Sequence, residues 1–239
     1  MPKRASSRLL VPIMLSLLAV SSISPALAYP PAGFDSFSSS ATIIIELTPI
    51  GGPGPFPFVA SGPTTIQRGD PLVDLDGRGY IDTEIISMTL TGPSPLGPII
   101  VRESPTLASS GRIKQQTPGV DFPADSFFDV FVEIDIPPGL PGLPAGGTCG
   151  NLPGSPAVMS AVINAIPPVG SSYGSPVGLV VPLFGIPPTP PIQCGRIMHV
   201  SHTVGEPIPV PKVPELILPA ILASSLSLVA LSAFKRVRK

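Results

Sequence analysis

One acidic turn places oxygen ligands at the spacing that calcium-binding loops use. Residues 74–84 read DLDGRGYIDTE, with carboxylates at alternate positions ahead of a glycine. Ca²⁺ prefers carboxylate oxygens, and an EF-hand loop needs glycine where its chain turns sharply. Arg78, however, stands where a third ligand is needed, and Glu84 comes one residue early. Two interpretations follow: an acidic turn that leads into a strand, or a calcium site formed by Asp74, Asp76, Asp82 and Glu84.

A nucleophile for acyl transfer is suggested by Gly170-Ser171-Ser172-Tyr173-Gly174, which matches the G-x-S-x-G pattern. That motif works where a strand turns sharply into a helix and exposes the serine. Here two prolines precede the match, and no Asp or Glu lies between Ser172 and His199 to complete a triad in the usual order. The segment therefore reads as a loop, and we expect no catalytic residue in it.

The two histidines, His199 and His202, are three residues apart in a predicted strand, so their side chains should point to opposite faces. They cannot easily share a metal ion, and we expect them to be solvated or to lie on an edge strand. The tripeptide Arg68-Gly69-Asp70 matches an integrin ligand but is short, and we assign it to a turn before Pro71.

The charge of the chain separates its middle from its ends. Between residues 29 and 212, seven Lys and Arg stand against fourteen Asp and Glu, a net charge of −7. Nucleic acids and anionic membrane surfaces need a basic face, so this composition argues against both as partners. An acidic exterior favours solubility outside the cell.

The middle of the chain is predicted to be all-β. Pro and Gly are abundant, but they cluster between apolar runs and so punctuate strands. In Phe127–Ile136, Phe128, Val130 and alternate residues onward are apolar, whereas Asp129, Glu133 and Asp135 face the other way, as in a half-buried antiparallel strand. The other candidates are 42–48, 63–68, 81–90, 99–103, 158–166, 177–184 and 195–204. This pattern favours an antiparallel β-sandwich, with a jelly roll as its nearest variant.

The cysteines predict a covalent link within the domain, and the proline-rich segments predict where the domain ends. Cys149 and Cys194 both lie in the middle of the chain, and we predict that they form a disulfide. Pro137–Gly147 reads as a loop. Residues 206–216 are predicted to form a semi-rigid proline-rich stalk, so the domain itself is expected to span 29–205.

Both ends of the chain carry targeting patterns. Basic residues precede the apolar run Leu9–Val20, and Ala26 and Ala28 supply the small residues that a signal peptidase reads, so residues 1–28 are predicted to be a signal peptide. Residues 217–234 carry no charge and would span roughly 27 Å as a helix, close to the thickness of a bilayer core. Basic residues in 235–239 predict that this tail is cytoplasmic and the body outside. A buried C-terminal core helix is the alternative.

The end of the chain resembles a known sorting signal. The tetrapeptide Val213-Pro214-Glu215-Leu216, the short apolar helix and the basic cluster are together similar to the PEP-CTERM signal, although Leu216 stands where the bacterial family has Pro and its archaeal relative has Phe. The resemblance implies recognition by an exosortase-type sorting peptidase. It implies no activity for the body.

Three hypotheses follow from the sequence. The first is an exported, non-enzymatic surface or matrix protein, structural or adhesive, which is anchored by its C-terminal helix. In one version of this hypothesis the protein is released after sorting. The second is a calcium-assisted module that binds extracellular polysaccharide, and the third is a secreted hydrolase. No cofactor other than calcium is implied.

Overall fold

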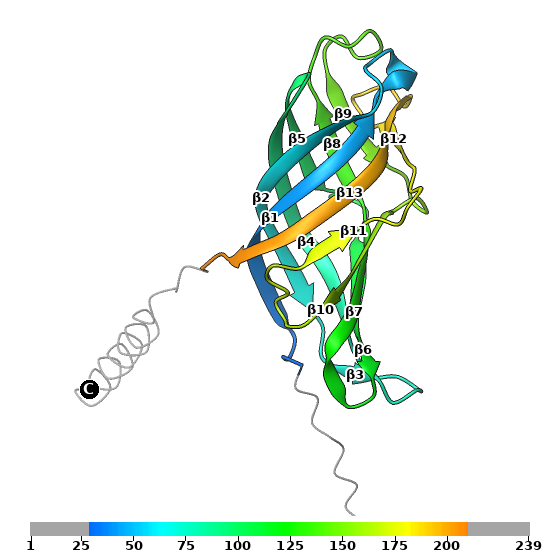
Figure 1. Cartoon of the computed structure of the whole chain (residues 1–239). Helices are drawn as coiled ribbons and strands as arrows, with labels where there is room; N and C mark the ends of the chain where they lie inside the picture. The colour runs from blue at the N-terminus through cyan, green and yellow to red at the C-terminus, as the bar shows by residue number, and fades with distance from the viewer. Residues whose placement is uncertain (1–28, 210–239) are drawn as a thin grey trace, which may run out of the picture.

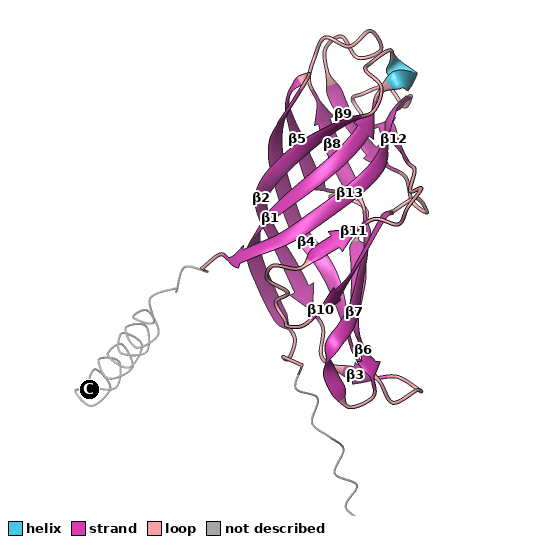
Figure 2. Ribbon diagram, viewed as in Figure 1, coloured by secondary structure: helices cyan, strands magenta, loops and turns pink. Residues whose placement is uncertain are grey.

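The computed structural model describes residues 29–209, which form an antiparallel all-β protein with one short 3₁₀ helix, η1 (Thr48–Ile50) (Figures 1 and 2). The all-β prediction is confirmed. Its strands are β1 (Gly33–Glu46), β2 (Phe56–Arg68), β3 (Leu72–Val73), β4 (Gly79–Ser94), β5 (Gly97–Glu103), β6 (Ser109–Thr117), β7 (Val120–Val130), β8 (Val132–Ile136), β9 (Gly147–Asn151), β10 (Ala157–Ile163), β11 (Ser172–Gly174), β12 (Val181–Gly185) and β13 (Gln193–Pro207).

A single 13-stranded sheet contains all of these strands, and it closes on itself because β1 pairs with β13. The long strands β1, β2, β4 and β13 run through most of the elongated barrel (Figure 1). One half is completed by β5, β8, β9 and β12, and the other by β6, β7, β10 and β11. Strand β4 belongs to both halves, since its first part pairs with β6 and its last part with β5.

The closed sheet differs from the predicted sandwich of two separate sheets. The closing contact joins the first and last strands of the domain, with Thr42 opposite Ser201 and Glu46 opposite Arg196. Alternation along one strand reports which face is buried, but not which distant strand lies beside it. The sequence pattern therefore supported the all-β class and could not distinguish one closed sheet from two stacked ones.

The interior of the barrel is filled by alternate side chains from every long strand. Phe37, Ile45, Ile81 and Ile134 are each 1% exposed or less. Two small cavities in the described core, both bordered by Met88, Met159 and His202, measure about 30 and 20 Å³. Such spaces are far smaller than pockets that hold drug-sized ligands.

The predicted strand Phe127–Ile136 is in fact two strands that meet at Phe131. Strand β7 pairs with β6 and β10, whereas β8 pairs with β5 and β9. The chain thus passes from one set of neighbours to another without losing the alternation, and Phe128, Val130, Val132, Ile134 and Ile136 are all buried as predicted.

Several strands carry little apolar pattern and were not predicted. Strand β6 reads SSGRIKQQT, and β9 reads GTCGN. Both are held by neighbours on two sides, so tertiary pairing rather than local preference decides their conformation. Strand β13 also extends to Pro207, and Glu206 and Pro207 are therefore part of the sheet and not of the predicted stalk.

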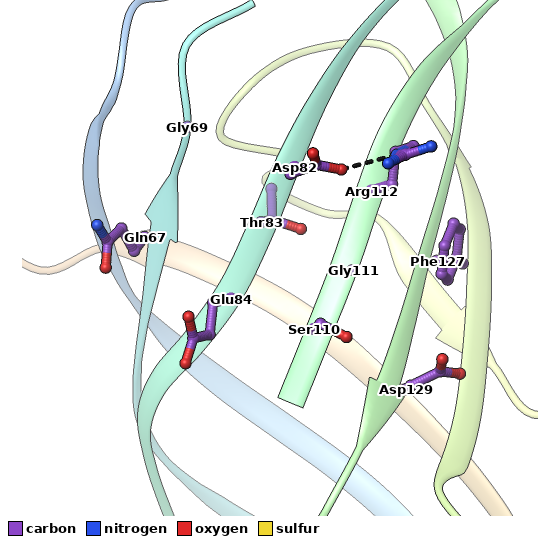
Figure 3. A pocket seen from close by; sticks show the side chains of 10 residues that line it. All are labelled: Gln67, Gly69, Asp82, Thr83, Glu84, Ser110, Gly111, Arg112, Phe127 and Asp129. Carbon is purple, nitrogen blue, oxygen red and sulfur yellow. Dashed lines mark hydrogen bonds and ion pairs between the residues drawn. The ribbon is translucent and has the colours of Figure 1, made fainter. Parts of the chain in front are cut away.

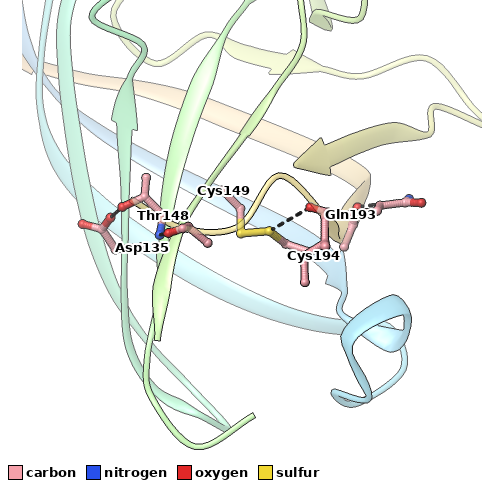
Figure 4. The surroundings of a disulfide bond; sticks show 8 residues. Asp135, Thr148, Cys149, Gln193 and Cys194 are labelled. Carbon is pink, nitrogen blue, oxygen red and sulfur yellow. Dashed lines mark hydrogen bonds between the residues drawn. A yellow bond between two sulfur atoms is a disulfide. The ribbon is translucent and has the colours of Figure 1, made fainter. Parts of the chain in front are cut away.

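The predicted disulfide is confirmed, because Cys149 and Cys194 are bonded with their Cα atoms 6.3 Å apart (Figure 4). Cys149 belongs to β9 and Cys194 to β13, and both are fully buried. Strand β12 lies between these two strands in the sheet order, and Cys149 is opposite Gly185 at its end.

The targeting predictions lie outside the described residues. They are the signal peptide 1–28 with Ala26 and Ala28, the motif Val213–Leu216, the transmembrane helix 217–234 and the tail 235–239. Within residues 29–209, no helix is both long and apolar enough to cross a membrane.

Candidate binding groove on the outer face

An open groove of about 630 Å³ lies on the outer face of the sheet, across strands β4, β6 and β7 and the end of β2 (Figure 3). Charged, hydroxyl and aromatic side chains gather in it. The residues that line it are Gln67, Gly69, Asp82, Thr83, Glu84, Ser110, Gly111, Arg112, Phe127 and Asp129.

Strand register brings these residues together in two rows. In one row Glu84 lies opposite Ser110, which in turn lies opposite Asp129. In the next row Asp82 lies opposite Arg112, which lies opposite Phe127. Directly opposite residues of an antiparallel sheet have their side chains on the same face. Three strands distant in the sequence thus contribute to one surface.

Asp82 and Arg112 neutralise each other within the groove. Arg112 Nε donates to Asp82 Oδ1 over 2.7 Å, and this hydrogen bond raises the pKa of Arg112 above its usual value (Figure 3). The Arg112 guanidinium also lies 4.4 Å from the centroid of the Tyr80 ring. Cation–π contact and ion pair together hold Arg112 over β4 and β6.

The other two carboxylates of the groove have no cationic partner in the described part of the chain. All six Lys and Arg of residues 29–209 form ion pairs, and none of their partners is Glu84 or Asp129. Glu84 is exposed and Asp129 is half-buried. The row through Ser110 is therefore acidic and unneutralised.

The predicted calcium ligands are not brought together. Asp74 Oδ1 accepts from the backbone N–H groups of Asp76 and Arg78, while its Oδ2 pairs with Lys114 at 2.5 Å. That lysine, through its hydrogen bond, is the main reason that the pKa of Asp74 is lowered. Asp76 pairs with Arg78. Residues 29–209 contain no group of three or more His, Cys, Asp or Glu that could hold a metal ion. The acidic-turn interpretation fits this geometry.

A second hollow, of about 330 Å³, adjoins the groove and shares Glu84 with it. Glu103 lines this hollow and accepts a hydrogen bond from Ser109 Oγ over 2.9 Å. Burial raises the pKa of Glu103 to about 7, and the charge of Glu84 acts in the same direction. Carboxyl groups with a pKa near neutrality can act as general acids.

The G-x-S-x-G match and the two histidines do not line the groove. Ser172 is in β11 and shares a hydrogen bond of 2.9 Å with Thr203, so it is not on a strand-to-helix elbow. His199 Nδ1 lies 3.1 Å from Ser175 Oγ. The sequence also predicts that His202 is solvated or lies on an edge strand. This residue is instead buried, because β13 is paired on both sides and the His202 side chain points into the barrel.

Arg68 and Asp70 hold the start of the domain. Arg68 pairs with Asp35 and donates to the carbonyl of Pro31 over 2.7 Å. Asp70 accepts from the backbone N–H of Ala32. These contacts give the Arg-Gly-Asp tripeptide a structural explanation within the fold.

Most of the groove was not identified from the sequence. The alternation in 127–136 did place Asp129 on the outer face, and the same period puts Phe127 there. Ser110 and Arg112 lie in the unpredicted β6, so no sequence pattern indicated that they join Asp82 and Glu84.

Comparisons with known proteins support the fold alone. No protein-family model matches the chain, and no curated protein matches it. The structure of DynF from the dynemicin biosynthesis pathway of Micromonospora chersina is similar, with a TM-score of 0.62 and 18% sequence identity, over 75% of this chain and 83% of that one. At this identity the likeness extends to the arrangement of strands, and nothing about the groove follows from it.

Proposed function

We propose that this is an exported, non-enzymatic surface or matrix protein whose domain holds extracellular glycan in the outer groove. The observation that carries the proposal is the open groove itself, in which an exposed aromatic ring lies beside unneutralised carboxylates and a serine hydroxyl. The disulfide supports the exported location, since such bonds persist in oxidising compartments.

The chemistry of the groove suits a sugar chain. Phe127 is 41% exposed and offers an apolar face against which the C–H side of a pyranose ring can pack. Glu84 and Asp129 accept hydrogen bonds from sugar hydroxyls, and Ser110 can both donate and accept. A wide groove across the outer face of three strands leaves both ends of a bound chain free to continue.

The C-terminal tail supports anchoring and sorting. Its stalk, acidic tetrapeptide, apolar stretch and basic cluster stand in the order that a membrane peptidase can engage at the outer interface. Val213, Pro214, Glu215 and Leu216 would then form the recognition element for an exosortase-type enzyme, after signal peptidase has cleaved behind Ala28.

Deleting residues 213–239 tests the location. We expect the truncated protein to appear folded in the medium, whereas the full-length protein stays with the membrane fraction. The measurement is fractionation followed by thermal unfolding of the released form. An insoluble or degraded truncated protein, with a full-length protein that is soluble without detergent, would show that the tail is a core helix.

Replacing the aromatic ring tests glycan binding. In the full-length protein, Phe127→Ala should weaken retention on immobilised extracellular polysaccharide at least several-fold, because the stacking surface is lost. Val162→Ala is the matched control, since Val162 is 56% exposed and does not line the groove. Chelator should leave retention unchanged, because the described carboxylates form no metal cluster. Equal retention of both variants contradicts the proposal.

A secreted hydrolase is a second candidate, favoured by the raised pKa of Glu103 beside Glu84. A protonated Glu103 would donate a proton to a leaving group, and an ionised Glu84 would serve as nucleophile or base. Assays for new reducing ends on the retained polysaccharide distinguish a hydrolase from a binding module. Turnover that disappears in Glu103→Gln supports the hydrolase, and retention without turnover supports the binding module.

A further inference from the structure

We infer that the groove selects a cationic amino sugar, a pyranose that carries a free ammonium group. This inference rests on the proposed glycan binding and names the class of sugar. Its basis is the charge of the row Glu84–Ser110–Asp129, together with the position of Phe127 in the neighbouring row (Figure 3).

No Lys or Arg among residues 29–209 forms an ion pair with the acidic row. Each Lys and Arg among residues 29–209 already pairs with a carboxylate elsewhere, and Arg112, the cation in the groove, is bound to Asp82. Glu84 and Asp129 flank Ser110 across β4, β6 and β7. The two carboxylates would supply anionic hydrogen-bond acceptors to a bound ammonium group from both sides of Ser110.

Ser110 and Phe127 supply the uncharged contacts of the proposed sugar site. Ser110 lies between the two carboxylates and can bond a ring hydroxyl or the amine itself. Phe127 is two residues from Asp129 on β7, so both side chains lie on the outer face. A sugar ring stacked on Phe127 would bring a substituent amine towards Asp129.

The surface favours a sugar over a basic peptide. Strands β4 and β6 are paired on both sides at the groove, so no free strand edge is offered for the addition of an extended peptide. A helical peptide needs an apolar groove, whereas Phe127 is the single large apolar side chain that lines this one. A polyhydroxylated, positively charged chain matches the donors and acceptors present.

The test compares oligosaccharides that differ in their amine. Full-length protein is titrated with a glucosamine tetramer, with its N-acetylated counterpart, with a uronic acid tetramer and with oligolysine. We expect the glucosamine tetramer to bind at least tenfold more tightly than the N-acetylated form, and the uronic acid tetramer to bind weakest. High salt should reduce the preference for the amine.

Variants separate the charge from the stacking. Glu84→Gln combined with Asp129→Asn should lower affinity for the glucosamine tetramer roughly tenfold and leave the N-acetylated tetramer unchanged. Asp125→Asn combined with Glu206→Gln is the control, because both side chains are exposed, the charge change is the same and neither lines the groove. Phe127→Ala should weaken both sugars, and Phe127→Tyr should restore them.

Each outcome is decisive. Equal binding of the amine and its acetylated form overturns the amino-sugar inference and leaves the proposed glycan binding in place. No binding of any sugar overturns both. Oligolysine that binds as tightly as the glucosamine tetramer and is insensitive to Phe127→Ala shows that the groove recognises cationic peptides, which also overturns the inference.

Discussion

At the scale of single residues, His202 is the polar group whose burial has the clearest consequence. Its side chain lies inside the barrel, its Nε2 has no hydrogen-bond partner, and both internal cavities border it. Burial lowers the pKa of His202 to about 4 from an ordinary value of 6.5. The folded protein therefore holds this imidazole neutral in an apolar interior.

Stability should fall as this histidine is forced to ionise. Between pH 6.5 and pH 4 the unfolded chain binds a proton at His202, whereas the folded chain does not. The free energy of unfolding therefore decreases as the pH drops. The loss reaches about 3 kcal/mol across that window. Denaturant unfolding at pH 7, 5.5 and 4 measures it.

His202→Leu isolates the contribution of the histidine. The variant should be nearly as stable as the wild type at pH 7, since an unpartnered nitrogen is removed, and more stable than the wild type at pH 4. Glu103 titrates in both proteins and has the opposite sign, because its raised pKa makes stability fall as the pH rises from 4.5 towards 7. Parallel pH profiles for variant and wild type would refute the assignment.

At the scale of elements, the passage from β7 to β8 lets one run of chain serve both halves of the barrel. The backbone groups that lose their sheet partners at this passage are satisfied by side chains. Asn151 Oδ1 accepts from Val132 N–H over 2.7 Å, its Nδ2 donates to the carbonyl of Val130 over 3.0 Å, and Ser109 Oγ accepts from Phe131 N–H. Asn151 is 5% exposed, so water cannot replace it.

Asn151→Ala should therefore be strongly destabilising. The substitution leaves a buried N–H and a buried carbonyl unpaired, at a cost of about 2–4 kcal/mol. Chemical denaturation measures the effect, and Asn164→Ala, at an exposed position, is the control and should change stability little. If the two variants are equally stable, the side chain does not hold the β7–β8 passage.

At the scale of the whole molecule, the sheet is closed by contacts between distant parts of the chain. Strand β1 pairs with β13, and the Cys149–Cys194 bridge ties β9 to β13 across a sequence separation of 45. The disulfide lies in the half that contains the proline-rich segments, where β9 and β12 are both short. The bridge compensates there for limited strand pairing.

Removing the bridge should weaken the domain without changing its fold. For Cys149→Ala combined with Cys194→Ala we expect a loss of about 4 kcal/mol, because the unfolded chain regains the entropy of an open loop. The melting temperature should fall by about 10 °C. Purified wild-type protein that reacts with two equivalents of alkylating agent in the absence of reductant would show that the bridge does not form.

The amino-acid sequence was sufficient to predict the all-β class of the fold and the Cys149–Cys194 disulfide. Period-two alternation in segments such as Phe127–Ile136 records which side chains avoid water, and the two cysteines of the predicted domain have one way to pair within the chain. The apolar core of β7 and β8 follows from this local pattern. The negative charge of the domain is likewise a matter of composition.

Which strands are neighbours, and therefore where the groove lies, depends on the tertiary structure. Polar strands such as β6 are set by pairing on both sides, and the register that brings Glu84, Ser110 and Asp129 into one row depends on contacts far apart in the sequence. The same is true of closure between β1 and β13 and of the burial of His202. Local periodicity specifies a face of a strand, whereas the partner across that face is chosen by the packing of the whole sheet.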